Sequence, residues 1–317
     1  MKKGNPTVRL STLQSRTQHS TKRRLAAVAV LAGVALAIAG CSSSPGGGSS
    51  PTATAKPKAS GPVDVLYAGS LVGLMEDQIG PAFHDETGYT LQGFGEGSSA
   101  LAAEIKGKVR QGDVFISASP DVNTTLQGAA NGDWVSWYAT FAASPLVIGY
   151  NPQSKFAGDI KSKAWYDVVT EPGFKLGSTD PKTDPKGKLA AQALTTAASQ
   201  QNLPALAKLA TSNPYIQTEQ SLVGQLQSGQ LDAGFFYSSE AKAANISTVP
   251  VTGQDLKAVY TVTELKGAPH SAAAEAFIAY LLGPKGQAVM KKDAYDLTVP
   301  AQVTGSGVPK SLGSLLG

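Results

Sequence analysis

The 317-residue chain has a single cysteine, Cys41, and only three histidines, His19, His84 and His270. One cysteine cannot form a disulfide within the chain, and it cannot supply a set of thiolates for a metal ion. Three histidines leave little material for a histidine-rich metal site or a catalytic triad. The sequence also has neither the nucleophile-elbow pattern nor the HExxH motif of hydrolases. These absences argue against most hydrolytic enzymes.

Charged residues are scarce as well, at 16% of the chain. Residues 1–41 hold seven of the 27 basic residues and none of the 23 acidic ones, so residues 42–317 have 20 basic and 23 acidic residues. A protein that binds nucleic acid needs a basic surface, and this chain has no basic excess outside its N-terminus. We therefore expect no nucleic-acid partner.

The N-terminus has the pattern of an export signal. Lys22, Arg23 and Arg24 precede the apolar run LAAVAVLAGVALAIAG, which ends at Cys41. The run is short for a membrane-spanning helix and ends in small residues. Its last four residues, Ile-Ala-Gly-Cys, resemble a bacterial lipobox, which implies cleavage before Cys41 and attachment of lipid there. A signal peptide with an incidental cysteine and an uncleaved anchor are the alternatives.

Residues 42–61 are rich in Ser, Pro and Gly and have no apolar period, which predicts a flexible spacer. From Pro62 onward, apolar segments typical of strands alternate with segments of helical periodicity. The expected strands lie near residues 63–69, 89–94, 112–117, 144–150, 174–177 and 229–237. The expected helices lie near residues 70–88, 100–109, 189–200, 222–226 and 271–290. This alternation predicts an α/β fold with mostly parallel strands.

Two corners between a strand and a helix carry a serine beside a glycine. Ser70 follows Gly69, and Ser98 follows Gly97. Each serine is a candidate N-cap of the next helix. Two such helix starts in one α/β lobe can also form an anion site, because helix N-termini present unpaired N–H groups and ligands of such sheets bind at the carboxyl ends of strands.

Several segments in order resemble the molybdate- and tungstate-binding proteins of ABC importers. They are Ala68-Gly69-Ser70-Leu71, Gly97-Ser98-Ser99, the strand at 113–118, the loop TDPKTDPKG at 179–187, Glu219, and the segments at 229–232 and 235–238. The loop resembles the DPNxDPCG sequence of the tungstate/molybdate branch. The resemblance covers the chain from Val63 to about Met290.

The resemblance implies a two-lobed type II periplasmic-binding-protein fold with mixed, mostly parallel sheets flanked by helices. We expect residues 62–142 and 247–317 to form the first lobe and residues 143–246 the second. Crossing segments are expected near Phe141–Pro145 and Asn245–Gly253, and the helix near Phe277–Leu282 should pack on the first lobe. The resemblance also implies that the lobes close on a tetrahedral oxyanion.

The site residues are also carried over from the resemblance. Ser70 and Ser98 would donate hydrogen bonds to the oxyanion, Tyr237 would donate its phenol O–H, and Asp184 and Glu219 would coordinate its metal centre. Such coordination offsets the repulsion between two carboxylates and a dianion, and it is not open to sulfate or phosphate.

Each of these acidic and aromatic residues also has an ordinary structural interpretation. Asp180 and Asp184 both precede proline, a common turn sequence, and Asp180 competes with Asp184 for the role in the site. Glu219 suits a helix start, and Tyr237 suits a core position at the end of a strand. The sequence departs from the family after the second Asp-Pro, where Lys186-Gly187-Lys188 stands in place of Cys-Gly-Tyr. Either lysine could place a positive charge near the anion and favour oxyanions such as sulfate or phosphate.

The sequence therefore predicts a non-enzymatic, lipid-anchored receptor outside the cytoplasmic membrane. It would act as a monomer, use no cofactor, and deliver molybdate or tungstate to a membrane permease and its ATPase. A receptor of the same fold for sulfate, phosphate, ferric iron or a small organic anion is the first alternative. A secreted hydrolase with an acidic pair is the second.

Overall fold

The computed structural model describes residues 59–317, all within one compact unit, Lys56–Gly317. The export signal, the lipidation predicted at Cys41 and nearly all of the predicted spacer lie outside the described residues. The strands are β1 (Gly61–Ala68), β2 (Tyr89–Glu96), β3 (Val114–Ser117), β4 (Trp137–Tyr150), β5 (Leu176–Thr179), β6 (Ile216–Gln217), β7 (Ala233–Tyr237), β8 (Ser247–Pro250), β9 (Lys257–Glu264) and β10 (Asp296–Gly305).

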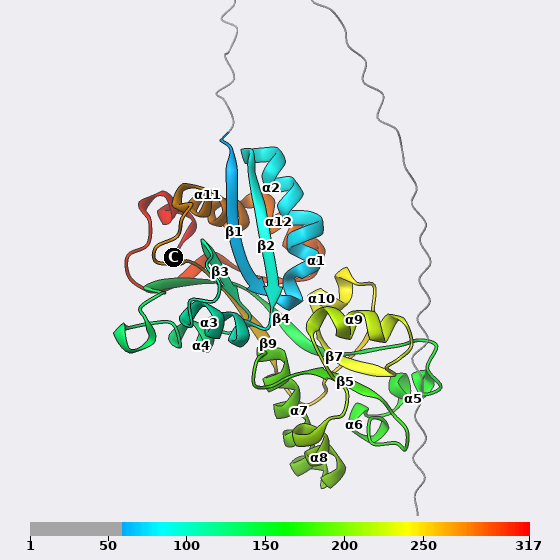
Figure 1. The fold of residues 1–317 in the computed structure, drawn as a ribbon. Coiled ribbons are helices and arrows are strands. Elements are labelled where there is room, and N and C mark those ends of the chain that lie inside the picture. The colour runs from blue at the N-terminus through cyan, green and yellow to red at the C-terminus, as the bar shows by residue number, and fades with distance from the viewer. Residues whose placement is uncertain (1–58) are drawn as a thin grey trace, which may run out of the picture. The chain divides into compact units, whose positions relative to one another are not determined.

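The helices alternate with these strands along the chain (Figure 1). The α-helices are α1 (Val72–Leu74), α2 (Gly80–Thr87), α3 (Ser98–Lys106), α4 (Pro120–Thr124), α5 (Ala157–Ser162), α6 (Trp165–Val168), α7 (Pro185–Gln201), α8 (Pro204–Ser212), α9 (Glu219–Gln227), α10 (Ser238–Ala243), α11 (Ser271–Leu282) and α12 (Pro284–Lys292). Shorter helical turns are η1 (Gly69–Leu71), η2 (Met75–Ile79), η3 (Ala129–Asn131) and η4 (Lys310–Leu315). Within residues 59–317, none of these helices combines the length and the apolar character needed to cross a membrane.

The strands form two groups that are joined through β4. The order of hydrogen-bonded neighbours is β2-β1-β3-β9-β4-β7-β5-β6, and β8 and β10 both pair with β4. The first part of β4, residues 137–145, pairs with β9 and β10, whereas residues 146–150 pair with β7 and β8. We call β1, β2, β3, β9 and β10 the first strand group and β5 to β8 the second strand group.

The sheet is mixed, as expected, but parallel pairs are not in the majority. Four pairings among the described strands are parallel, and the five antiparallel ones all involve β4 or β9. These two strands carry the chain from the first group to the second and back again. They therefore run against their neighbours, whereas strands followed by a helical crossover remain parallel.

Both faces of the first strand group are covered. On β1, Val65 and Tyr67 belong to the main core, whereas Leu66 between them packs with α3 and α4 on the opposite face. Helix α11 covers the main-core face, where Phe277 meets Phe83 of α2 edge to face at 5.4 Å between ring centroids. The expectation that the C-terminal helix packs on this part of the chain is confirmed.

The first helical segment is continuous through Gly80-Pro81. Its apolar positions Leu71, Leu74, Met75, Ile79 and Phe83 are all buried. The chain does not break at Gly80-Pro81, because a π-helical turn, η2, leads into α2. Proline has no N–H to give to the helical ladder, and a wider turn before it accommodates that loss.

Candidate functional site

Five connections at the carboxyl ends of strands bring polar residues together. They follow β1, β2, β3, β5 and β7, so they come from both strand groups. Each runs directly or through a short loop into a helix. This is the position at which ligands of open α/β sheets bind.

The two serines predicted at helix starts are buried, but neither acts as an N-cap. Ser70 lies within η1, whose cap position is Ala68, and Ser98 is the first residue of α3, whose cap is Gly97. The Ser70 hydroxyl lies 3.1 Å from the hydroxyl of Tyr260, and the Ser98 hydroxyl accepts a hydrogen bond from the backbone N–H of Ala118 at 3.1 Å. The N-cap interpretation is therefore wrong for both, because Ser70 bonds to a tyrosine of β9 and Ser98 to the connection after β3 instead.

Of the two aspartates in the loop after β5, Asp184 is the buried one. It is the N-cap of α7, and its side chain accepts a hydrogen bond from the backbone N–H of Lys186 at 2.7 Å. Asp180 accepts a bond from the backbone N–H of Lys182 in the turn and is not buried. The loop therefore directs Asp184 inward and uses Asp180 as a turn residue.

Glu219 reaches the same place from α9, where it is the first helical residue after the N-cap Thr218. It is buried, and its Oε1 lies 3.2 Å from the ammonium of Lys186. Lys186 is itself fully buried and pairs with both carboxylate oxygens of Glu240, at 3.0 and 2.8 Å. One lysine is thus enclosed by acids from α9 and α10.

The aromatic wall of this cluster consists of Tyr237, Tyr260 and Tyr295. The rings of Tyr237 and Tyr260 meet edge to face at 6.2 Å, and those of Tyr260 and Tyr295 at 5.6 Å. The Lys186 ammonium lies 5.7 Å from the centre of the Tyr237 ring. Contacts therefore run without a break from Ser70 through the tyrosines to Lys186 and Glu219.

Three buried polar atoms of this region lack a hydrogen-bond partner among residues 59–317 when the carboxyl groups are ionised. They are Thr179 Oγ1, Glu219 Oε2 and Tyr237 Oη. Buried polar groups are normally paired, since an unpaired one costs about 1–3 kcal/mol. Thr179 and Glu219 line the same cavity, and Glu219 and the Tyr237 ring lie beside Lys186, so a polar ligand entering there would complete their bonding.

The carboxyl groups of the cluster are arranged to retain a proton. Burial raises the pKa of Glu219 well above its usual range, and the adjacent Asp184 carboxylate raises it further, whereas Lys186 opposes both effects. Burial also raises the pKa of Asp184. The two groups lie close enough to form a hydrogen bond when one of them is protonated. We therefore expect one proton to be shared between Asp184 and Glu219.

Lys186 remains charged in spite of its burial. Burial lowers its pKa, but the carboxylates of Glu219 and Glu240 outweigh that effect, and the net pKa is raised. Three carboxyl groups, those of Asp184, Glu219 and Glu240, therefore surround a single ammonium. The ammonium of Lys186 is the positive charge of the cluster.

Two surface cavities flank the cluster. One of about 460 Å³ is lined by η1 and α1 on one side and by α9, α10 and Tyr295 on the other, and it includes Ser70, Glu219 and Glu240. The second, of about 420 Å³, lies between the start of α3 and the loops that carry Asp184 and Glu219. The cluster thus lies between two openings, each bounded by both strand groups.

The sequence analysis did not identify Glu240, Tyr260 or Tyr295 at this place. Glu240 could have been found from the sequence, because an acidic residue at the third position of a helix often bonds to the backbone N–H of the N-cap residue. Here Glu240 Oε2 accepts a bond from the N–H of the N-cap Tyr237 at 3.3 Å. Tyr260 lies within β9 and Tyr295 just before β10, where nothing in the local sequence distinguishes them from core aromatics. Only the tertiary fold brings them to the cluster.

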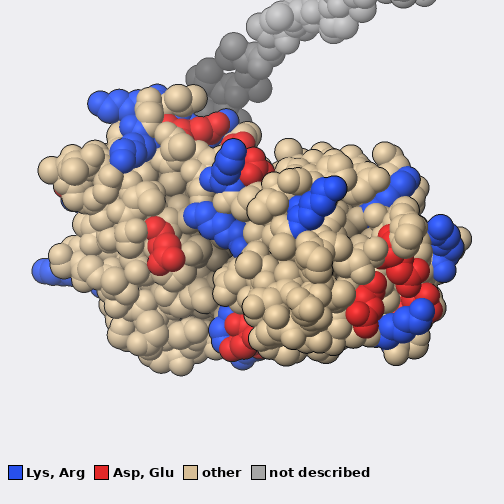
Figure 2. All heavy atoms as spheres, turned by 90° about the horizontal axis from the view of Figure 1, so that it is seen from below, with Lys and Arg blue, Asp and Glu red and all other residues tan. Residues whose placement is uncertain are grey.

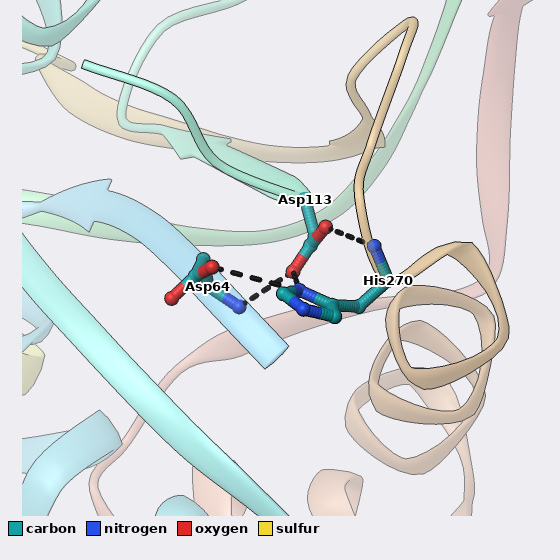
Figure 3. A group of neighbouring side chains, drawn as sticks. All are labelled: Asp64, Asp113 and His270. Carbon is teal, nitrogen blue, oxygen red and sulfur yellow. Dashed lines mark hydrogen bonds and ion pairs between the residues drawn. The ribbon is translucent and has the colours of Figure 1, made fainter. Parts of the chain in front are cut away.

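A second polar cluster lies at the opposite ends of the strands (Figure 3). Asp113 accepts hydrogen bonds from the backbone N–H groups of Asp64 and His270, both at 2.7 Å, and its Oδ2 lies 2.9 Å from His270 Nδ1. The Asp113 side chain is fully buried. Both of its oxygens are used in joining β1 to the start of α11, so the group has a structural explanation without a metal ion.

The surface carries no broad area of one charge on the face shown in Figure 2, where basic and acidic side chains are scattered. This agrees with the low charge content of the sequence.

The chain matches a family of solute-binding proteins along most of its described length. The family model described as bacterial extracellular solute-binding protein matches residues 63–296. The chain therefore belongs to the bacterial extracellular solute-binding proteins.

Relatives within this group carry names that refer to molybdenum. A putative ABC transporter molybdenum-binding protein of Haloferax volcanii is 32% identical over 56% of this chain, and the match spans only 56% of that protein's length. A molybdate/tungstate-binding protein of Thermococcus kodakarensis is 26% identical over 69% of this chain and 76% of its own. The resemblance inferred from the ordered sequence segments is confirmed.

The solved structures agree on the fold. The periplasmic molybdate-binding protein of Azotobacter vinelandii superposes with a TM-score of 0.59 at 23% identity, covering 74% of this chain and 99% of that one. The sulfate-binding protein SubI of Mycobacterium tuberculosis gives 0.54 at 17% identity, covering 74% and 86%. The predicted α/β periplasmic-binding-protein fold is confirmed.

Proposed function

We propose that this chain is the extracytoplasmic receptor of an ABC importer and that it binds molybdate or tungstate between two lobes. The first lobe would comprise residues 62–142 and 247–317, and the second residues 143–246. Ser70, Ser98, Asp184, Glu219 and Tyr237 would bind the oxyanion, with Asp184 and Glu219 directed at its metal centre. The protein would hand its ligand to a membrane permease and its ATPase and would catalyse no reaction.

One observation carries the proposal. Buried polar side chains from both strand groups converge, and the hydroxyls of Thr179 and Tyr237 lack partners among the described residues. A tetrahedral oxyanion offers four acceptor oxygens, which suit the hydroxyls of Ser70 and Tyr237. The names of the relatives supply the choice of oxyanion.

Isothermal titration of the purified chain tests this function. Molybdate and tungstate should each bind at one tight site, and sulfate should bind much more weakly, since sulfur cannot accept the two carboxylates. Equal affinity for sulfate would reject coordination of the metal centre. Absence of binding by all three anions would reject the oxyanion receptor altogether.

A sulfate or phosphate receptor is the second candidate, and Lys186 is the observation that favours it. A buried ammonium neutralises any tetrahedral dianion, whatever its central atom. Titration with sulfate distinguishes the two candidates, because a molybdate or tungstate receptor should bind sulfate much more weakly and a sulfate receptor should bind it tightly.

We further propose that the mature chain begins at Cys41 and is held to the membrane by lipid, as a monomer. Metabolic labelling with a fatty-acid analogue should mark the full chain and leave Cys41→Ser unlabelled. Equal labelling of both would reject this anchor.

A further inference from the structure

Lys186 occupies the centre of the candidate site although the related binding proteins gave no reason to expect a lysine there. It is fully buried at the start of α7, within the loop where the sequence departs from the family pattern. A lysine is rarely buried unless it is paired. The question is what this ammonium does when a ligand enters.

The two partners of Lys186 hold it unequally. Glu240 binds it with both oxygens, at 3.0 and 2.8 Å, whereas Glu219 binds it with Oε1 alone, at 3.2 Å. Glu240 is also fixed to the backbone N–H of Tyr237 at the start of α10. The contact with Glu219 is therefore the one that can be exchanged.

Glu219 is incompletely bonded on its other side. Its Oε2 has no hydrogen-bond partner among the described residues while the carboxyl groups are ionised, and it points at Gly69, where an added Cβ would lie 2.5 Å from it. The hydroxyl of Tyr237 is unpaired as well, and its ring lies 5.7 Å from the Lys186 ammonium. A negatively charged ligand between these groups would find its positively charged partner in the Lys186 ammonium.

We propose that Lys186 is a ligand-binding and specificity-determining residue that exchanges Glu219 for an oxygen of the bound oxyanion while Glu240 keeps it in place. This inference rests on the proposed oxyanion function and assigns a residue to it. The exchange frees the Glu219 carboxyl to turn away from the ammonium. Glu240 then acts as a positioning residue, since it touches Lys186 and not the ligand.

The charges support this assignment. Buried carboxyl groups surround Lys186 at this place, so an entering dianion needs the ammonium as a nearby cation. The ammonium offers a charge-assisted hydrogen bond that serves every tetrahedral oxyanion, including those that cannot accept carboxylates at their centre. Lys186 therefore broadens the range of oxyanions that the site accepts.

Titration of the full chain with sodium molybdate and sodium sulfate tests the proposal through Lys186→Met. Its matched control is Lys188→Met, which removes the same charge from an exposed position two residues further along α7. Lys186→Met should weaken molybdate roughly 10- to 100-fold, the range of a hydrogen bond to a charged group, and weaken sulfate at least as much. Lys188→Met should bind both anions as the unaltered chain does.

Lys186→Met leaves Glu219 and Glu240 unpaired and could destabilise the chain, so a second variant is needed. Lys186→Met combined with Glu240→Gln removes one charge of each sign and keeps the net charge of the site. If the ammonium contacts the ligand, this double variant should also lose affinity at least 10-fold while its circular dichroism and unfolding remain cooperative.

The outcomes are distinct. Wild-type affinity in the double variant would overturn the role of Lys186, because net charge alone would then suffice. A loss of molybdate binding in Lys188→Met equal to that in Lys186→Met would overturn it too. Failure of the unaltered chain to bind either anion would instead reject the proposed function on which this inference rests.

Discussion

At the scale of single residues, the loop after β5 shows how one aspartate is selected from two similar ones. Asp184 is buried as the cap of α7, whereas Asp180 bonds within its own turn. We therefore expect Asp184→Ala to weaken tungstate binding far more than Asp180→Ala, by at least 10-fold in titration. The opposite ranking would show that the loop register relative to the related proteins is wrong.

Glu219 should make the ligand-free protein less stable as the pH rises. Its folded-state pKa lies well above the ordinary value of 4.5, because of burial and of Asp184. A raised acid pKa means that the folded state binds the proton more tightly, so stability falls as the pH rises from 4.5 through the folded pKa. Glu219→Gln should therefore raise the free energy of unfolding more at pH 8 than at pH 5.

Urea unfolding at pH 5 and pH 8 measures this effect. Glu171→Gln, at a half-exposed position on another loop, is the control for loss of one acidic charge. If Glu219→Gln raised the free energy of unfolding equally at pH 8 and pH 5, the titration of Glu219 would not be the cause.

Sequence patterns located Ser70, Asp184, Glu219 and Tyr237, which share the buried cluster, but they did not reveal how each is bonded. Cap preferences predicted that Ser70 and Ser98 close helices, yet their partners, Tyr260 and the N–H of Ala118, come from distant segments. Local sequence carries no information on such partners. The pairing of Lys186 with Glu240 could not be predicted either, because the two residues are 54 positions apart in the sequence.

At the scale of elements, the strands and helices with strong periodicity could be predicted well. The expected helix near residues 271–290 is divided at Gly283-Pro284, where α11 ends and α12 begins. The first half of β4 could not be predicted, since WYATFAAS has no alternation: it is paired on both edges and buried on both faces. Sequence patterns that depend on one exposed face fail for such a strand.

The start of α3 and the loop at residues 180–184 should require a glycine between them. An added Cβ at Gly97 would lie 2.5 Å from the carbonyl oxygen of Thr183 and 3.2 Å from Asp184 Cβ. Gly97→Ala should therefore weaken molybdate binding at least 10-fold, because these elements could no longer approach each other. Gly224→Ala in α9, where a Cβ meets nothing within 4 Å, should bind normally in the same titration. Equal molybdate affinity in Gly97→Ala and Gly224→Ala would show that the close approach at Gly97 is not needed for binding.

The junction of β1, β3 and α11 should contribute to stability alone. Asp113→Asn replaces one acceptor oxygen with an NH₂ group that faces N–H donors. We expect the free energy of unfolding in urea to fall by about 1–3 kcal/mol, the cost of leaving a buried group unpaired. Molybdate affinity should not change, since the cluster lies at the other ends of the strands. A large loss of affinity without loss of stability would indicate a role in binding.

At the scale of the whole molecule, the proposed closure around a ligand would depend on the contacts between the strand groups. Among the described residues, these contacts include two hydrogen bonds. Gln220 donates to the carbonyl of Gly95 at 2.9 Å, and the N–H of Ala100 donates to the carbonyl of Thr183 at 3.1 Å. Neither involves a charged group, so each contributes only about 1 kcal/mol. If the proposed closure buries Asp184 and Glu219, the loss of their hydration would oppose it.

A ligand that contacts both strand groups can shift the equilibrium towards the closed form. The shift in free energy is limited to the difference between its binding free energies for the closed and the open forms. We therefore expect molybdate to reduce the radius of gyration of the chain in small-angle X-ray scattering, and Gln220→Ala to require more molybdate for the same change. Sulfate at equal concentration should have a smaller effect if the carboxylates coordinate the metal centre. A radius of gyration that does not change with saturating molybdate would mean that the two strand groups are already held together without ligand. The unpaired Tyr237 hydroxyl would then be tolerated by the closed protein.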